Sequence, residues 1–154
     1  PGNAQAWCNL GTIVDEVVLV NGQEYTGEQL LVEALKRNSE NAHAWFSLAT
    51  VIDDDSVSVN GQDYTLQQLL VEALKHDPQS ANAWGALSSV VDGESCINVN
   101  GQEFTVQQLL VEALKHDPEN AQAWSGLAGT MSPGDSVCVN GKMCTQSECE
   151  EAAE

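Results

Sequence analysis

The side chains best suited to chemistry in this sequence are five cysteines, at positions 8, 96, 138, 144 and 149. No two of them form a Cys-x-x-Cys pair, the spacing that is typical of zinc knuckles and of thioredoxin-like redox sites. The sequence therefore predicts neither kind of site, and it leaves the cysteines as disulfide partners or as small core residues.

Three histidines are the remaining candidates for a transition-metal site. His76 and His116 each follow a lysine at the end of a stretch with helical apolar periodicity. A positive side chain there complements the C-terminal dipole of a helix, which explains these two histidines without a metal. His43 stands in a different context, so we expect the histidines to bind no metal.

Two acidic clusters, Asp53 to Asp55 and Asp92 to Glu94, are candidate calcium ligands. Neither belongs to a twelve-residue Asp-x-Asp-x-Asp-Gly loop, so solvated turn residues are the favoured interpretation. The sequence also has no phosphate-binding glycine loop and no Gly-x-Ser-x-Gly elbow. We expect a protein that is not an enzyme and that needs no cofactor.

The charge balance restricts the class of partner. The chain has 5 basic and 23 acidic residues, a formal net charge of −18. Long-range repulsion argues against nucleic acid and against an anionic membrane surface, and the acidity is explained by solubility or by a basic partner. No run of 18 or more apolar residues is present, so we expect no membrane span.

An internal repeat organises the whole chain. Tryptophans stand at positions 7, 45, 84 and 124, which are 38, 39 and 40 residues apart. The sequence Val-Asn-Gly recurs at a similar spacing, so one supersecondary unit occupies about 40 residues, within the range of solenoid repeats. We place the repeats at residues 1–38, 39–77, 78–117 and 118–154.

Each repeat is expected to begin with a short helix that is announced by Asn-Ala-x-Ala-Trp or by the variant Ser-Ala-Asn-Ala-Trp. The Asn or Ser is a good N-cap, and a leucine three residues after each tryptophan gives an apolar stripe. Small residues that follow, such as Gly11, allow close approach of a neighbouring helix. The expected core of these helices is Trp7, Trp45, Trp84, Trp124, Leu10, Leu48, Leu87 and Leu127.

A two-residue hairpin is expected next, because Asn-Gly between alternating apolar residues favours positive φ at both turn positions. The turn residues are Asn21, Gly22, Asn60, Gly61, Asn100, Gly101, Asn140 and Gly141. The register then pairs Val57 with Tyr64 on one face and Ser58 with Asp63 on the other. We expect the aromatic residues Tyr25, Tyr64 and Phe104 to lie on the helices.

A second helix is expected to follow each hairpin. Thr65 and Gln68 fit a capping box, as do their counterparts in the other repeats. Leu69, Leu70, Ala73 and Leu74 then give an apolar stripe, and Asp-Pro ends the helix.

The helices resemble the tetratricopeptide repeat. Ala-x-Ala-Trp-x-x-Leu, followed later by Glu-Ala-Leu-Lys-His-Asp-Pro-x-Asn, has that family's Trp, Leu and small residue on the first helix and its Ala and Pro on the second. The inserted hairpin departs from the standard unit and is similar to hairpin-bearing variants in long repeat proteins of unicellular eukaryotes. The resemblance implies a right-handed helical solenoid that serves as an interaction scaffold, and it implies no chemistry.

The pitch of stacked helix pairs, roughly 10 Å, matches that of two adjacent strands. We therefore expect successive hairpins to pair into one continuous antiparallel sheet beside the helices. The predicted fold class is an α+β repeat solenoid of four helix–hairpin–helix units in a right-handed, tetratricopeptide-like superhelix. Its first and last strands would be open edges.

The two chain ends are expected to differ. Pro1 aligns with Pro78 and Pro118, so the chain begins within an inter-repeat turn, as expected of a processed, trimmed or partial chain. Trp7 and Leu10 have no preceding second helix to cover them. At the other end, Glu150, Glu151 and Glu154 replace the Leu110, Val111 and Leu114 of the third repeat, which indicates a polar cap or a diverged unit.

The last repeat also contains the cysteines most suited to pairing. Cys144 takes the position of the aromatic residue and Cys149 that of Leu109, so both are expected to face inward and to lie near each other. They form either a disulfide or two buried free thiols. Because five is an odd number, an inter-chain bond through Cys8, Cys96 or Cys138 is also considered.

The leading functional hypothesis is a non-enzymatic structural protein that stacks end to end with copies of itself into an elongated or filamentous assembly, with Trp7, Leu10, Cys149 and Glu150 at the joint. The alternative is an adaptor that binds a basic or amphipathic peptide on its concave face. Gln5, His43, Asn82 and Gln122, at one equivalent position, form no clamp. An extracellular setting is weakly favoured by the disulfide considered above and by the acidic, lysine-poor surface, and a cytosolic one remains open.

Overall fold

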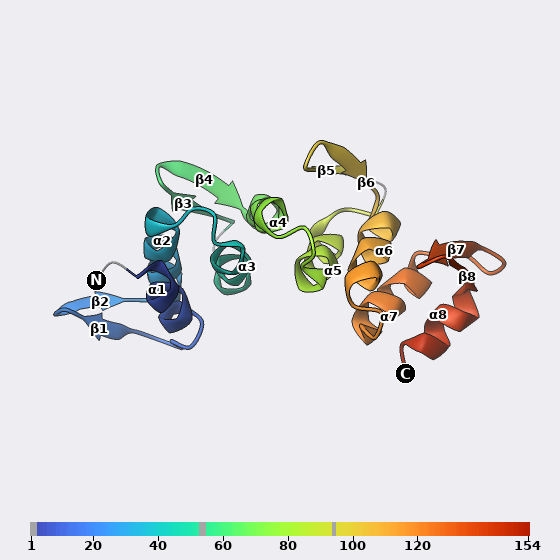
Figure 1. The fold of residues 1–154 in the computed structure, drawn as a ribbon, viewed down its shortest axis with the longest axis horizontal. Coiled ribbons are helices and arrows are strands. Elements are labelled where there is room, and N and C mark those ends of the chain that lie inside the picture. Colours follow the sequence, from blue (N-terminus) through green and yellow to red (C-terminus); the bar gives the residue numbers. More distant parts are fainter. Residues whose placement is uncertain (1–2, 53–54, 94) are drawn as a thin grey trace. The chain divides into compact units, whose positions relative to one another are not determined.

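A computed structural model describes residues 3–52, 55–93 and 95–154 (Figure 1). The chain divides into two compact units, unit 1 (residues 1–77) and unit 2 (residues 78–154), and each contains two helix–hairpin–helix repeats. Unit 1 consists of α1 (Ala4–Gly11), β1 (Val18–Val20), β2 (Gln23–Tyr25), α2 (Gly27–Arg37), α3 (Ala42–Val51), β3 (Ser56–Val59), β4 (Gln62–Thr65) and α4 (Leu66–His76). Unit 2 consists of α5 (Ala81–Val90), β5 (Ile97–Val99), β6 (Gln102–Phe104), α6 (Val106–His116), α7 (Ala121–Gly129), β7 (Ser136–Val139), β8 (Lys142–Thr145) and α8 (Gln146–Ala152).

The helices begin where the sequence predicts. Thr26, Thr65, Thr105 and Thr145 each close a capping box with the Gln or Glu three residues later. Each box satisfies amide groups at a helix start that would otherwise have no partner. Asn41, Ser80 and Asn120 accept a hydrogen bond from the backbone N–H three residues later.

The core of each unit lies between consecutive helices. In unit 1, α1 packs on α2, α2 on α3 and α3 on α4, and in unit 2 α5 to α8 pack in the same sequence. The contacts are made by the leucine stripes, and the leucines with no exposed surface are Leu30, Leu31, Leu35, Leu48, Leu69, Leu74, Leu87, Leu109, Leu114 and Leu127. The repeat is thus held together by apolar contacts between neighbours along the chain.

The four hairpins have the register that the sequence predicts. Val57 pairs with Tyr64 and Ser58 with Asp63, and the other hairpins follow the same pattern. All four turn asparagines have positive φ, between 51° and 54°. The glycines that follow, such as Gly61 at φ 82°, occupy the region that only glycine enters without strain.

The tryptophans link each hairpin to its helices. Trp7 packs against Tyr25 with ring centroids 5.2 Å apart, and both Trp45–Tyr64 and Trp84–Phe104 are 5.0 Å apart. The fourth tryptophan, Trp124, has Cys144 in place of an aromatic partner and is only half-buried. Leu10 is also half-buried, whereas its three counterparts have no exposed surface.

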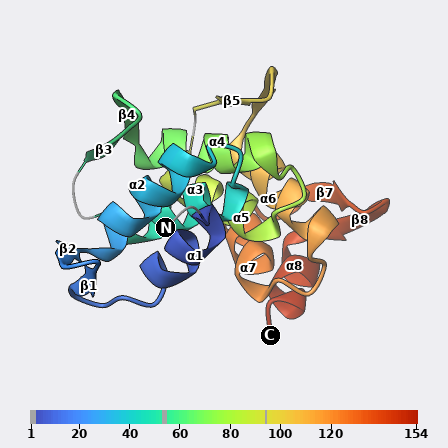
Figure 2. The same cartoon turned by 60° about the vertical axis from the view of Figure 1, so that its left-hand side comes forward.

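The expected continuous sheet is not present among the described strands, which form four separate two-stranded sheets. In unit 1 the strand β3 contacts helix α2, and in unit 2 the strand β7 contacts α6. The second hairpin therefore packs on a helix and does not pair with the first hairpin. Figures 1 and 2 show the β1–β2 and β3–β4 hairpins of unit 1 apart from each other. The match between the spacing of stacked helix pairs and that of adjacent strands did not predict the arrangement of the hairpins. Strands of three or four residues are positioned by the helix on which they pack.

Candidate functional site

The largest exposed apolar surface among the described residues lies on the first repeat. Ile13, Val17 and Leu19 are 73%, 54% and 66% exposed, and they fall within seven consecutive residues. We call these three residues the N-terminal apolar surface. Val17 and Leu19 are two residues apart, so the strand alternation places them on the outer face of the β1–β2 hairpin, opposite Val18 and Val20.

The same positions are polar in the second repeat, where Ser56 and Ser58 replace Val17 and Leu19. In that repeat they belong to β3, the strand that contacts α2. The fourth repeat shows the same packing and adds a hydrogen bond from the Asn140 side chain to the carbonyl of Leu114, at 2.9 Å. The second helix of the preceding repeat thus contacts the hairpin, while the outer-face residues Ser56 and Ser58 stay exposed.

The residues expected at the joint lie elsewhere. Trp7 is 9% exposed, because it packs against Tyr25 and because the Arg37 guanidinium lies 4.5 Å from its ring centroid. The open apolar surface is therefore not formed by the Trp7 ring. A sequence signal for the N-terminal apolar surface existed. Leu19 and Cys138 are the apolar residues at a repeat position that Ser58 and Asn98 occupy in the other two repeats.

The C-terminal helix α8 has a different character. It has seven residues where the other second helices have eleven. Only Cys149 is buried in it, and Glu150 and Glu151 are exposed. At the start of α8, hydrogen bonds from the backbone and side chain of Thr145 and from Lys142 lower the pKa of Glu148. This helix presents an acidic outer surface, as a polar cap does.

All five cysteines are free thiols in the structure. Cys144 and Cys149 are buried, as expected for inward-facing residues, and the Cys149 thiol lies 4.0 Å from the sulfur of Met131. Burial, the nearby Cys144 and two glutamates raise the pKa of Cys149. Both side chains lie in the same corner of the last repeat. A disulfide between them therefore stays a prediction.

Cys8 was considered for a disulfide bond to another chain, but its position in the structure does not favour one. Its side chain has no exposed surface, and burial raises its pKa. The α1 face that holds Cys8 turns inward, so a disulfide to another molecule would require unfolding. Cys96 and Cys138 are exposed and remain available for such a bond.

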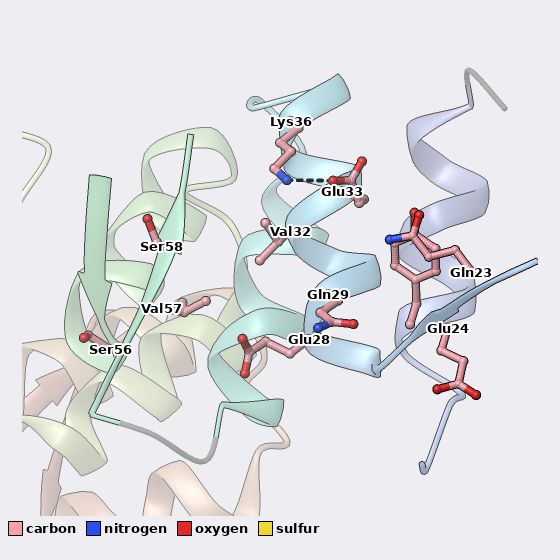
Figure 3. Close-up of a pocket in the computed structure, with 11 residues that line it drawn as sticks. Gln23, Glu24, Glu28, Gln29, Val32, Glu33, Lys36, Ser56, Val57 and Ser58 are labelled. Atoms are coloured by element: carbon pink, nitrogen blue, oxygen red, sulfur yellow. Dashed lines mark hydrogen bonds and ion pairs between the residues drawn. The ribbon is translucent and has the colours of Figure 1, made fainter. Parts of the chain in front are cut away.

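A groove recurs between the second helix of one repeat and the hairpin of the next. In unit 1 it has a volume of about 460 Å³ and is lined by β2, α2 and β3. Figure 3 shows Glu28 and Val32 of α2 pointing toward Ser56 and Val57 of β3. The groove of unit 2, about 320 Å³, is lined by the equivalent residues of β6, α6 and β7.

The described residues that line the two grooves include no histidine. The main interaction in the first is the ion pair between Glu33 and Lys36, 2.6 Å apart, which together with Arg37 lowers the pKa of Glu33. Within the described part of the chain, no group of three or more His, Cys, Asp or Glu residues could hold a metal ion.

The remaining candidates for chemistry stand alone. Asp53, Asp54 and Glu94, considered as calcium ligands, lie outside the described residues, and Asp55 and Asp92 are exposed. His76 lies 3.8 Å from Glu72, one turn away on the same helix.

No helix among the described residues has the length and apolar character needed to cross a lipid bilayer. No protein-family model matches this chain, and no curated protein matches it either.

Proposed function

We propose that this chain is a non-enzymatic structural repeat protein that stacks end to end with copies of itself into an elongated or filamentous assembly. The repeats would continue as a right-handed, tetratricopeptide-like superhelix through each joint. The resemblance of the helices to an interaction scaffold supports this proposal.

The observation that carries the proposal is the N-terminal apolar surface. Val17 and Leu19 are exposed on the outer face of the first hairpin, and the turn residue Asn21 stands where Asn140 of the fourth repeat bonds to the second helix of the preceding repeat. Exposed apolar side chains at such positions favour burial by a helix of another molecule. A heterologous joint of this kind propagates into a filament when its rotation does not close a ring.

The acidic surface of α8 opposes this joint at neutral pH. Stacking would bring Glu150 and Glu151 of one copy toward the apolar surface of the next, and each copy has a net charge of −18. Dissolved salt screens the repulsion between exposed like charges. We therefore expect stacking to strengthen as the salt concentration rises.

Sedimentation velocity over a wide range of protein concentration tests the proposal. The mean mass is expected to grow with concentration and to reach no plateau. A strictly monomeric particle at all concentrations would contradict assembly, and a plateau at a dimer would contradict end-to-end stacking.

A variant with Val17→Ser and Leu19→Ser gives the sharpest comparison, because it carries the residues that the second repeat tolerates at these positions. It should remain monomeric. Met143, which is 57% exposed in the last hairpin, gives the control. Met143→Glu removes an exposed apolar side chain outside the N-terminal apolar surface and should leave stacking intact.

A second candidate function is that of an adaptor for a basic or amphipathic peptide. The recurring groove favours it, because the same helix and strand positions line the groove in both units. This surface lies on the second helices and hairpins rather than on Gln5, His43, Asn82 and Gln122 of the first helices.

A further inference from the structure

We infer that the unit 1 groove binds an extended basic peptide, which adds as a strand to the open edge of β3. The inference rests on the adaptor candidate and is independent of end-to-end stacking. It assigns the ligand class and the residues that select it.

The edge of β3 is accessible from the groove. Ser56, Val57 and Ser58 all line it, although consecutive residues of a strand point to opposite faces. A groove that touches all three residues must therefore meet the edge of the strand. The other edge of β3 is paired with β4.

The backbone at this edge is suited to strand addition. In a two-residue hairpin the pair next to the turn, Val59 and Gln62, exchanges both hydrogen bonds, and the pattern then alternates. The peptide groups of Ser58 and Ser56 consequently point away from β4. Among the described residues they have no backbone partner outside their own hairpin. A peptide strand can pair with these groups.

The side chains that line the groove favour a basic ligand. Glu24 and Glu28 line the groove, and no ion pair involves either of them among the described residues. Lys36 is paired with Glu33 and is thus neutralised. Val32 and Val57 offer an apolar floor between the charges, so a peptide of alternating basic and aliphatic residues matches both features.

Unit 2 provides a built-in comparison. Its groove keeps Val111, Lys115 and Val137 in place of Val32, Lys36 and Val57, but Gln107 stands in place of Glu28. Glu103, the equivalent of Glu24, does not line it. The second groove is therefore lined by the same helix and strand positions but lacks the excess negative charge. It should bind a basic peptide less tightly.

The probe is a short synthetic peptide of alternating lysine and valine with blocked termini, titrated into the isotopically labelled full chain at low salt. Amide chemical-shift changes are expected at β3 and along α2. Glu28→Gln should weaken binding to the first groove by roughly twofold to fivefold, the range for an exposed ion pair. Gln107→Glu should strengthen binding to the second groove by a similar factor.

A peptide of the same sequence with alternate backbone amides methylated keeps the charge and loses the hydrogen bonds. It should bind at least tenfold more weakly. Equal binding of the methylated peptide, shifts centred away from β3, or no effect of Glu28→Gln would each overturn the inference. Sedimentation of the same variants separates the two proposals, because Glu28→Gln should leave stacking unchanged and Val17→Ser with Leu19→Ser should leave peptide binding unchanged.

Discussion

At the scale of single residues, Trp45 and Trp84 each connect three parts of their repeat. The Trp45 ring packs on the hairpin residue Tyr64, while its indole N–H donates to the carbonyl of Ser39 in the inter-repeat turn at 2.7 Å. Trp84 and Trp124 donate in the same way to the carbonyls of Pro78 and Pro118. A buried indole N–H needs such a partner. The position of the tryptophan therefore fixes both the turn before the first helix and the hairpin after it.

Gly11 is required by the close contact of α1 with α2. A Cβ atom there would lie 2.8 Å from Cγ of Leu31 and 3.0 Å from the carbonyl oxygen of Gly27. We expect Gly11→Ala to destabilise the protein by about 1–3 kcal/mol, the usual cost of overpacking. Gly85→Ala is the matched control, because open space surrounds Gly85 in helix α5. It should stabilise by about 0.5–1 kcal/mol through helix propensity. Urea denaturation of both variants measures the difference, and equal effects would contradict the close contact.

Glu33 makes the stability of unit 1 depend on pH. Its pKa is lowered first by the hydrogen bond from Lys36 and then by that from Arg37. The folded state thus binds this proton less tightly than the unfolded state does, and the resulting stability is present above the usual glutamate pKa of about 4.3. That stability is lost as the pH falls below this value. Thermal unfolding between pH 6 and pH 3 should show a smaller decrease for Glu33→Gln than for the natural sequence, and parallel curves would contradict the assignment.

At the scale of elements, the sequence predicts local structure well and the arrangement of the hairpins poorly. Thr65 with Gln68 and the Asn60–Gly61 turn act within a few residues, so their patterns identify a helix start and a hairpin register. The prediction of a continuous sheet was wrong because such a sheet requires β3 to pair with β2, whereas β3 contacts α2. Tertiary contacts decide between these two arrangements, and the local sequence does not encode them. The exposure of Leu19 was missed for a related reason. Val-Leu-Val predicts an ordinary strand, and the sequence does not show whether another element covers its outer face.

The last hairpin offers a test of the contact between hairpin and helix. Cys144→Phe should supply Trp124 with the ring that Phe104 supplies to Trp84. We expect a gain of about 0.5–1.5 kcal/mol for the new aromatic pair and a blue shift of Trp124 emission. The reverse change, Phe104→Cys, should cost about 2–4 kcal/mol through the cavity that it leaves. Urea titrations under reducing conditions measure both, and a loss of stability in Cys144→Phe would show that the site has no room for a ring.

At the scale of the whole molecule, the two units differ in how completely their repeats are built. Both hairpins of unit 1 place an aromatic residue on a tryptophan, whereas unit 2 has one such pair. Unit 2 also ends in the short helix α8, in which Cys149 is the only buried residue. Because repeat proteins are stabilised mainly by contacts within and between neighbouring repeats, each unit contains most of the contacts that it needs.

Fragments of residues 1–77 and 78–154 should therefore fold separately, each with a cooperative urea transition. Domains of this size rarely exceed about 3–5 kcal/mol in stability. Unit 1 is expected to be the more stable, since both of its repeats are complete. The second fragment begins with Pro78, whose carbonyl accepts the hydrogen bond from Trp84 and so must be kept. Circular dichroism and hydrogen exchange of the two fragments test this, with the weakest protection expected in α8. A coil-like spectrum from the 1–77 fragment would mean that the repeats are stable only as a longer array.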